Sequence, residues 1–174
     1  ELIKKKIDYR GVIYFGLMIT KSGAKVIEYN CRFGDPECQT IMPLMDSNFV
    51  NLLYKCSMGN LNGSEQIITD NKVSGCVIAT SNGYPQDYKV GYQIQLENNK
   101  DKDLQVFHSG TSINESGELI TDGGRVLSIV CQNKDFDSAF EKAYNYLNKV
   151  KFKGMFYRKD IGHQVRESHK GKRN

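Results

Sequence analysis

Three polar side chains occupy every second position of the segment VIEYNCRFGDPE, namely Glu28, Asn30 and Arg32. Because the side chains of a β-strand alternate between its two faces, these three would project to the same side. Carboxylate and amide oxygens are ligands that Mg²⁺ prefers, and Mg²⁺ usually also holds nucleotide phosphates. An arginine beside such a cation can face the negative charge of a phosphoryl or acyl-phosphate group. The spacing therefore indicates a cation and phosphate site, while an ion pair between Glu28 and Arg32 on a solvated face remains the alternative.

The residues that follow this triplet predict a turn and the start of a helix. Gly34 permits a tight turn, Asp35 is a good N-cap, and Pro36 suits the first helical position. A strand, a glycine turn and a capped helix in succession favour a functional site over a solvated face. Asp35 either contacts a substrate amine or caps the helix, and capping is the commoner role of an aspartate before a proline.

A β-hairpin is predicted upstream of this turn. Residues 11–20 form an apolar, β-rich run and residues 25–33 are again strand-like, and the turn residues Lys21, Ser22 and Gly23 lie between them. The helix after Pro36 is expected to break or kink at Pro43, and a second helix is expected at 48–58. The hairpin residues expected on its buried face are Ile27, Tyr29 and Cys31.

The second half of the chain predicts short strands and one long helix. Strands are expected at GCVIAT, YQIQL, LQVFHSG and RVLSIVC, with a hairpin around Asn114–Gly117. Apolar residues at helical spacing predict a helix over Phe136–Val150, capped by Asp135 and packed on the preceding strands. The stretch FKGMFY adds a final strand.

The motifs of this chain resemble those of the phosphoribosylamine-glycine ligase family. YRGVIYFGLMIT and KVIEYNCRFGDPECQTIMPLM are similar to the end of that family's ATP-grasp domain, and the likeness continues through GYP, HSGT, GGRVL and YRKDIG. The resemblance implies an α/β (α+β) fold, in which part of an ATP-grasp domain precedes a small mixed β-sheet and helix domain. The implied divisions are 1–60 for the ATP-grasp part, 61–71 for a linker, 72–161 for the C-terminal domain and 162–174 for a polar basic tail.

The same resemblance implies an activity and a set of site residues. Members of the family use ATP to phosphorylate glycine and then join it to 5-phosphoribosylamine, with Mg²⁺ or Mn²⁺ as the cofactor. Matched position by position, Glu28 and Asn30 correspond to the metal ligands, and Arg32 and Asp35 to catalytic residues lining the substrate side. The physical reading of the strand assigns similar roles to the first three.

Two later motifs are candidate substrate-binding segments. His108 could contact phosphate or ribose, with donors from Gly110 and Thr111, although His-Ser-Gly is also an ordinary turn sequence. Gly124 and Arg125 could belong to an anion-binding turn, although paired glycines before a strand more often mark a bulge or a tight corner.

The chain also departs from the wider ATP-grasp pattern. Residues 11–20 contain no carboxylate, so a second metal would need other ligands. The family's ATP-clamping segments lie upstream of Glu1, and the absence of an initiator methionine leads us to expect a piece of a longer protein. We therefore expect the isolated chain to be inactive and the first hairpin to lack packing partners. The expected partners are the missing N-terminal half and, in a fused parent, later enzymes of purine biosynthesis.

Composition narrows the remaining alternatives. The net charge of +4 comes from 24 basic and 20 acidic residues, with basic clusters toward both ends, but no nucleic-acid motif accompanies them. No apolar run is long enough to span a membrane, and five cysteines without metal-binding spacing favour reduced thiols in the cytoplasm. The alternatives are another ATP-grasp ligase or carboxylase, and a noncatalytic binding module whose basic ends meet phosphates.

Overall fold

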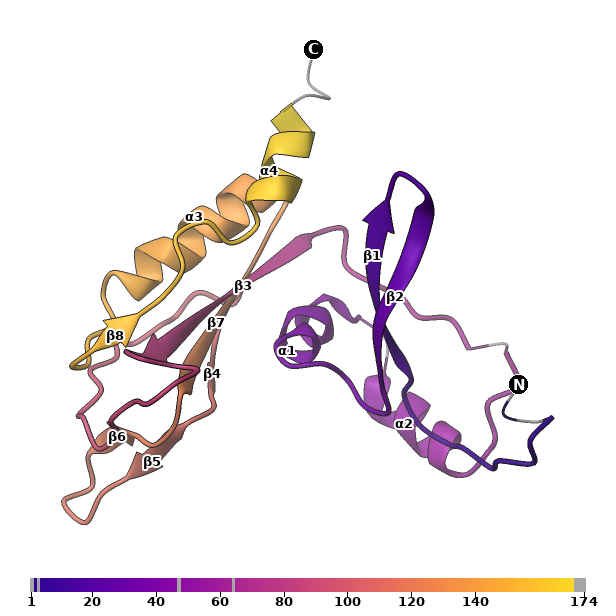
Figure 1. Cartoon of the computed structure of the whole chain (residues 1–174), viewed down its shortest axis with the longest axis horizontal. Helices are drawn as coiled ribbons and strands as arrows, with labels where there is room; N and C mark the ends of the chain where they lie inside the picture. The colour runs from indigo at the N-terminus through magenta and orange to yellow at the C-terminus, as the bar shows by residue number, and fades with distance from the viewer. Residues whose placement is uncertain (1, 3, 47, 64, 171–174) are drawn as a thin grey trace. The chain divides into compact units, whose positions relative to one another are not determined.

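The computed structural model describes residues 2, 4–46, 48–63 and 65–170 (Figure 1). The chain divides into two compact units, one formed by Glu1–Cys38 with Met45–Asp70 and the other by Gln39–Leu44 with Asn71–Asn174. Within the described ranges, no helix has the length and apolar character needed to cross a membrane.

The first unit contains the expected β-hairpin. Strands β1 (Tyr14–Thr20) and β2 (Gly23–Asn30) are antiparallel, and Tyr14 stands opposite Asn30. Gly23 has a φ of +98°, a left-handed conformation that glycine adopts without the steric cost of a side chain. The predicted hairpin and its turn are therefore confirmed.

The apolar face of this hairpin is exposed in this chain, as expected for a hairpin that lacks its packing partners. Tyr29 is 64% exposed and Ile27 is 63% exposed, and Cys31 is also exposed. Phe15 packs edge-on against Tyr29 with ring centroids 5.1 Å apart, but this pair still lies at the surface. Most of the apolar side chains that the structure describes on β1 and β2 are exposed, because two strands alone bury little apolar area.

Short helices follow the hairpin. Helix α1 (Glu37–Ile41) begins after Pro36 as predicted, and the 3-10 helix η1 (Met42–Leu44) contains Pro43. Helix α2 (Phe49–Ser57) confirms the second predicted helix, and its N-cap Asn48 accepts a hydrogen bond from the backbone of Asn51. Because Thr69 forms a β-bridge with Met45, the segment expected to be a linker makes contacts within the first unit.

The second unit is built on an antiparallel sheet of four strands in the order β4-β7-β3-β8. Strands β5 (Thr111–Ile113) and β6 (Leu119–Thr121) form the predicted hairpin beside it. The expected strand at YQIQL is absent, since among its residues only Gln93 and Gln95 form isolated bridges. The sheet strands are β3 (Val73–Ser81), β4 (Leu104–His108), β7 (Arg125–Asn133) and β8 (Met155–Phe156).

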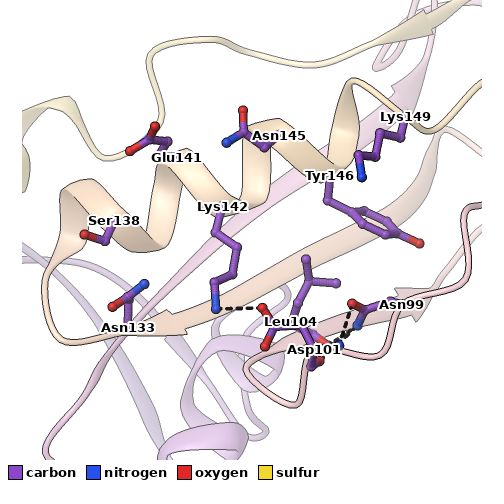
Figure 2. A pocket seen from close by; sticks show the side chains of 10 residues that line it. All are labelled: Asn99, Asp101, Leu104, Asn133, Ser138, Glu141, Lys142, Asn145, Tyr146 and Lys149. Atoms are coloured by element: carbon purple, nitrogen blue, oxygen red, sulfur yellow. Dashed lines mark hydrogen bonds and ion pairs between the residues drawn. The ribbon is translucent and has the colours of Figure 1, made fainter.

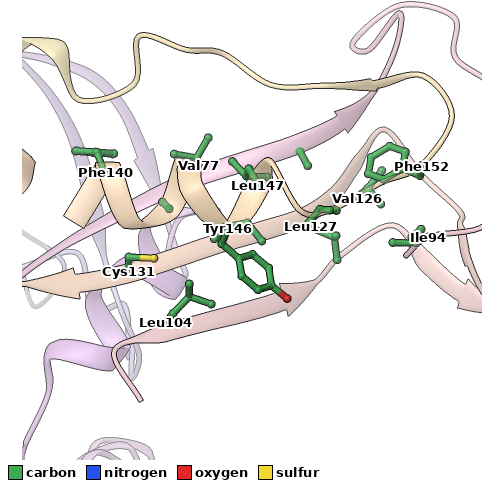
Figure 3. Packing of buried hydrophobic residues seen from close by; sticks show 14 residues of the cluster. Val77, Ile94, Leu104, Val126, Leu127, Cys131, Phe140, Tyr146, Leu147 and Phe152 are labelled. Carbon is green, nitrogen blue, oxygen red and sulfur yellow. The ribbon is translucent and has the colours of Figure 1, made fainter. Parts of the chain in front are cut away.

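Helix α3 (Phe136–Leu147) packs along one face of this sheet and forms the core with it (Figure 3). Val77 pairs with Ile129, and Ala79 pairs with Leu127, so these residues share the face toward the helix. The helix presents mainly Phe140, Ala143 and Leu147 to them. Asp135 caps the helix as predicted and accepts a hydrogen bond from the backbone of Ser138 at 2.8 Å.

The segment expected to be a polar basic tail from residue 162 contains a helix that the sequence analysis did not predict. Helix α4 (His163–Lys170) follows Gly162, and Arg166 Nε lies 2.6 Å from Asp137 Oδ1 on α3. This ion pair joins residues 29 positions apart, so local composition did not reveal it. Residues 171–174 of the expected tail lie outside the described residues.

Candidate functional site

Glu28 and Asn30 lie on one face of β2, as their spacing predicts. Asn30 Nδ2 donates a hydrogen bond to Glu28 Oε1 at 3.0 Å. Gly16 stands opposite Glu28 on β1, and a Cβ atom on Gly16 would approach Glu28 Cγ to 2.9 Å. The glycine therefore leaves the space in which the Glu28 side chain lies.

Two further residues lie next to Glu28 and Asn30, and the sequence analysis did not identify either of them. The Tyr14 hydroxyl donates a hydrogen bond to Glu37 Oε1 at 3.1 Å, and Tyr14 stands opposite Asn30 in the hairpin. The hydrogen bond to Glu37 and repulsion by its charge raise the pKa of Tyr14, and the charge of Glu28 adds to the effect. The only sequence signal for Glu37 was its place in the GDPE motif. Its contact with Tyr14 on β1 depends on the fold.

Arg32 and Asp35 occupy the turn between β2 and α1. Strand β2 ends at Asn30, so the alternation of side chains along a strand no longer applies at Arg32. The prediction that Arg32 projects on the same face as Glu28 is therefore not supported by the strand geometry. Arg32 is exposed, and its Nη1 donates a hydrogen bond to the carbonyl of Phe33 at 2.8 Å. Asp35 is also exposed, two residues before the first residue of α1.

The face of β2 has the donor set of a hard-cation site. Glu28 offers carboxylate oxygens, and the Asn30 amide offers an oxygen once its carboxamide turns, since the two ends of an amide are exchanged by a flip. In the described part of the chain, no three His, Cys, Asp or Glu side chains gather in a way that could hold a metal. The donors present fit Mg²⁺ or Mn²⁺, which would complete its coordination with water and substrate phosphates.

The later candidate residues come together at one corner of the second unit. His108 Nδ1 lies 3.2 Å from Thr111 Oγ1, and the Gly110 amide donates to the carbonyl of Arg125 at 2.8 Å. Ser81 Oγ donates to the carbonyl of Gly123 at 2.8 Å, and the Ser81 amide donates to Gly124. The HSGT and GGRVL segments therefore form one backbone corner with the end of β3.

Close packing explains the glycines of this corner. A Cβ atom on Gly110 would lie 2.6 Å from Gly123 Cα and 2.7 Å from the carbonyl oxygen of Arg125. A Cβ atom on Gly124 would lie 2.1 Å from the ring of Tyr84. Because the Gly110 amide already donates to Arg125, it is engaged within the protein.

Gly110→Ala is expected to destabilise the second unit by about 2 kcal/mol or more, because its methyl group meets two backbone atoms that cannot turn aside. Chemical denaturation followed by circular dichroism measures this change. Ser116→Ala, in the exposed turn between β5 and β6, is the control and should alter stability by less than about 0.5 kcal/mol. Equal stability of the two variants would contradict the packing argument.

Among the described residues of the second unit, two of the surface hollows are large, and neither of these is lined by a predicted site residue. One of about 410 Å³ runs between α3 and the loop before β4, where Lys142 Nζ lies 2.8 Å from Asp101 Oδ2 (Figure 2). The other, of about 610 Å³, lies beside Tyr88, Tyr92 and Lys153. The predicted residues thus form two clusters on strands and turns outside these hollows.

The cysteines do not add a reactive group to either cluster. All five lie in the described part of the chain, and no disulfide joins them. Burial raises the pKa of Cys131 to about 12, so its thiol stays protonated at neutral pH.

Comparison with known proteins assigns the first part of the chain to the ATP-grasp class. A biotin carboxylase from Campylobacter jejuni is similar in fold, with a TM-score of 0.62 and 17% identity over 90% of this chain and 35% of that chain. Residues 1–38 match the phosphoribosylglycinamide synthetase ATP-grasp (A) domain, and residues 74–164 match the C domain of the same synthetase. The chain belongs to the phosphoribosylglycinamide synthetase family, and its α/β fold with an ATP-grasp portion is confirmed.

Individual relatives agree with this assignment. The phosphoribosylamine–glycine ligase of Synechocystis sp. is 44% identical over 94% of this chain and 39% of its own length. A trifunctional purine biosynthetic protein from Gallus gallus is 41% identical over 93% of this chain and 16% of its own length. The solved phosphoribosylamine–glycine ligase of Thermotoga maritima is 32% identical, with a TM-score of 0.80 over 91% of this chain and 39% of that chain. The chain therefore spans about two fifths of the length of the single-function relatives.

Proposed function

We propose that this chain is the C-terminal part of an ATP-dependent ligase that joins glycine to 5-phosphoribosylamine. The observation that carries the proposal is the hydrogen-bonded pair Glu28 and Asn30, which lies on the hairpin within the residues that match the ATP-grasp domain. The named activity of the Synechocystis relative, 44% identical over nearly the whole chain, supports the choice of substrates.

The proposed reaction has two steps, and each has candidate residues. The glycine carboxylate attacks the terminal phosphorus of ATP to give glycyl phosphate and ADP, and the amine of phosphoribosylamine then displaces phosphate to give glycinamide ribonucleotide. Mg²⁺ or Mn²⁺ would screen the phosphate charges during transfer. Glu28 and Asn30 would hold the cation, Arg32 would face the transferred phosphoryl group, and Asp35 would contact the substrate amine.

The corner of the second unit is proposed to bind the ribose phosphate side. His108, Thr111 and Arg125 carry the side chains that can donate to phosphate or ribose oxygens. Gly110 and Gly124 contribute by lacking a side chain, because a Cβ atom at either position would collide with neighbouring residues of the corner. This role stays a proposal for all five residues.

The parent protein is proposed to act in the cytoplasm and to contain the upstream part of the ATP-grasp domain. The exposed apolar residues of β1 and β2 support a missing packing partner for the hairpin. Trifunctional relatives from Gallus gallus and Homo sapiens support fusion to further purine enzymes as a second arrangement of the parent.

We expect the chain alone to release no ADP above background in the presence of ATP, Mg²⁺, glycine and phosphoribosylamine. The chain spans only 39% of the length of the Synechocystis relative, and a transition state open to water loses most electrostatic stabilisation. Addition of the upstream half of the ATP-grasp domain, made separately, should restore ADP release that depends on both substrates.

The outcomes separate the competing functions. ADP release by the mixture that needs a different carboxylate or amine would identify another ATP-grasp ligase or carboxylase. No release by a folded complex would leave a noncatalytic binding module as the better account.

A further inference from the structure

A second carboxylate lies beside the proposed cation face. Glu37 Oε1 accepts a hydrogen bond from the Tyr14 hydroxyl at 3.1 Å, and Tyr14 stands directly opposite Asn30. Asn30 in turn donates to Glu28 at 3.0 Å. The contacts and the strand register thus connect Glu37, Tyr14, Asn30 and Glu28, although Glu37 lies outside the hairpin.

The turn after β2 fixes the place of Glu37. The Cys38 amide donates to the carbonyl of Gly34 at 2.9 Å, which closes the turn at the start of α1. Gly34 is buried, and a Cβ atom on it would lie 2.2 Å from Glu37 Oε2. The missing side chain of Gly34 therefore makes the space in which the Glu37 carboxylate turns toward Tyr14.

The hairpin itself supplies only one carboxylate. Strand β1 reads YFGLMIT, and β2 contains Glu28 as its sole acidic residue. A divalent cation is bound more tightly when a second negative charge lies nearby, even where that charge does not touch the cation. Glu37 is placed to provide this charge from outside the sheet.

We propose that Glu37 is a positioning residue of the cation site, which Tyr14 holds beside Glu28 and Asn30 so that its charge strengthens divalent-cation binding there. The inference rests on the proposed function, because it takes Glu28 and Asn30 as the cation ligands. It adds two residues, Glu37 and Tyr14, that the spacing of the β2 ligands does not include.

The test is the dissociation constant of Mn²⁺ for the complete protein, measured by the loss of the free-ion electron paramagnetic resonance signal. Glu37→Gln keeps the size of the side chain and removes its charge, so we expect binding weaker by about five- to tenfold. Tyr14→Phe releases the tether but keeps the charge, so we expect a smaller loss of about two- to threefold. The double variant should bind no more weakly than Glu37→Gln, because Tyr14 acts through Glu37.

Two reference variants make the outcomes distinct. Glu115→Gln, in the exposed turn between β5 and β6, should bind Mn²⁺ as the unchanged protein does. If Glu28→Gln also binds normally, the cation site and the proposed function built on it are wrong. If Glu28→Gln loses binding while Tyr14→Phe and Glu37→Gln keep it, only the positioning role is overturned.

Thermal unfolding of the same variants separates positioning from a purely structural role. Lower unfolding midpoints for Tyr14→Phe and Glu37→Gln with unchanged Mn²⁺ dissociation constants would overturn the inference. Tyr14→Phe decides the question alone if Glu37→Gln does not fold, because the phenylalanine ring keeps the packing of the tyrosine ring.

Discussion

Under the proposed function, Glu28→Gln is expected to lower the turnover of the complete protein by about 10²- to 10³-fold, with a matching loss of divalent-cation affinity. The substitution keeps the length and shape of the side chain but removes its negative charge. Asn30 would then be the remaining ligand from β2, and a neutral amide pair attracts a divalent cation weakly. Steady-state ADP release as a function of Mg²⁺ concentration measures both effects.

The matched control for this prediction is Glu115→Gln. Glu115 is exposed in the turn between β5 and β6, so its loss removes one carboxylate without touching either candidate cluster. Turnover should stay within about twofold of the unchanged enzyme. A Glu28→Gln enzyme with nearly normal turnover at every Mg²⁺ concentration would show that Glu28 is not a ligand.

Leu127→Ala is expected to destabilise the second unit by about 3 kcal/mol. Leu127 is fully buried, and it packs in the core between the sheet and α3 (Figure 3). The substitution removes apolar contacts and leaves a cavity that the surrounding strands cannot close. Urea denaturation followed by far-ultraviolet circular dichroism measures the free energy of unfolding.

Ile113→Ala is the control for the core substitution. Ile113 belongs to the same unit on β5 but is 64% exposed, so it contributes little apolar burial. Its truncation should cost less than about 1 kcal/mol. Similar losses in both variants would mean that the described core does not carry the stability of this unit.

Local sequence predicted the elements whose signals lie within a few residues. Asp135 and the apolar spacing after it identified α3, because a cap and one helix face are set by neighbours three or four positions away. Alternation identified β2 and placed Glu28 and Asn30 on one face. Alternation failed at YQIQL, where Gln93 and Gln95 form only isolated bridges to different segments.

Local sequence patterns could not predict contacts between residues that are far apart in the chain. Tyr14 and Glu37 are 23 residues apart, and their hydrogen bond depends on the turn at Gly34. The helix after Gly162 was missed because its composition is polar, while its ion pair to Asp137 comes from packing against α3. The exposure of the apolar residues of β1 and β2, in contrast, was expected from the resemblance, because it places the packing partners of the hairpin upstream of Glu1.

The sequence by itself determined the family, the order of most helices and strands, and the candidate oxygen ligands on β2, because motifs and local periodicity are properties of neighbouring residues. The tertiary structure decided which distant groups meet. It brought Glu37 to Tyr14, closed the corner of Gly110 and Gly123, and left Ile27 and Tyr29 exposed. Burial and side-chain contact depend on segments far apart in the chain, so only the folded arrangement could settle them.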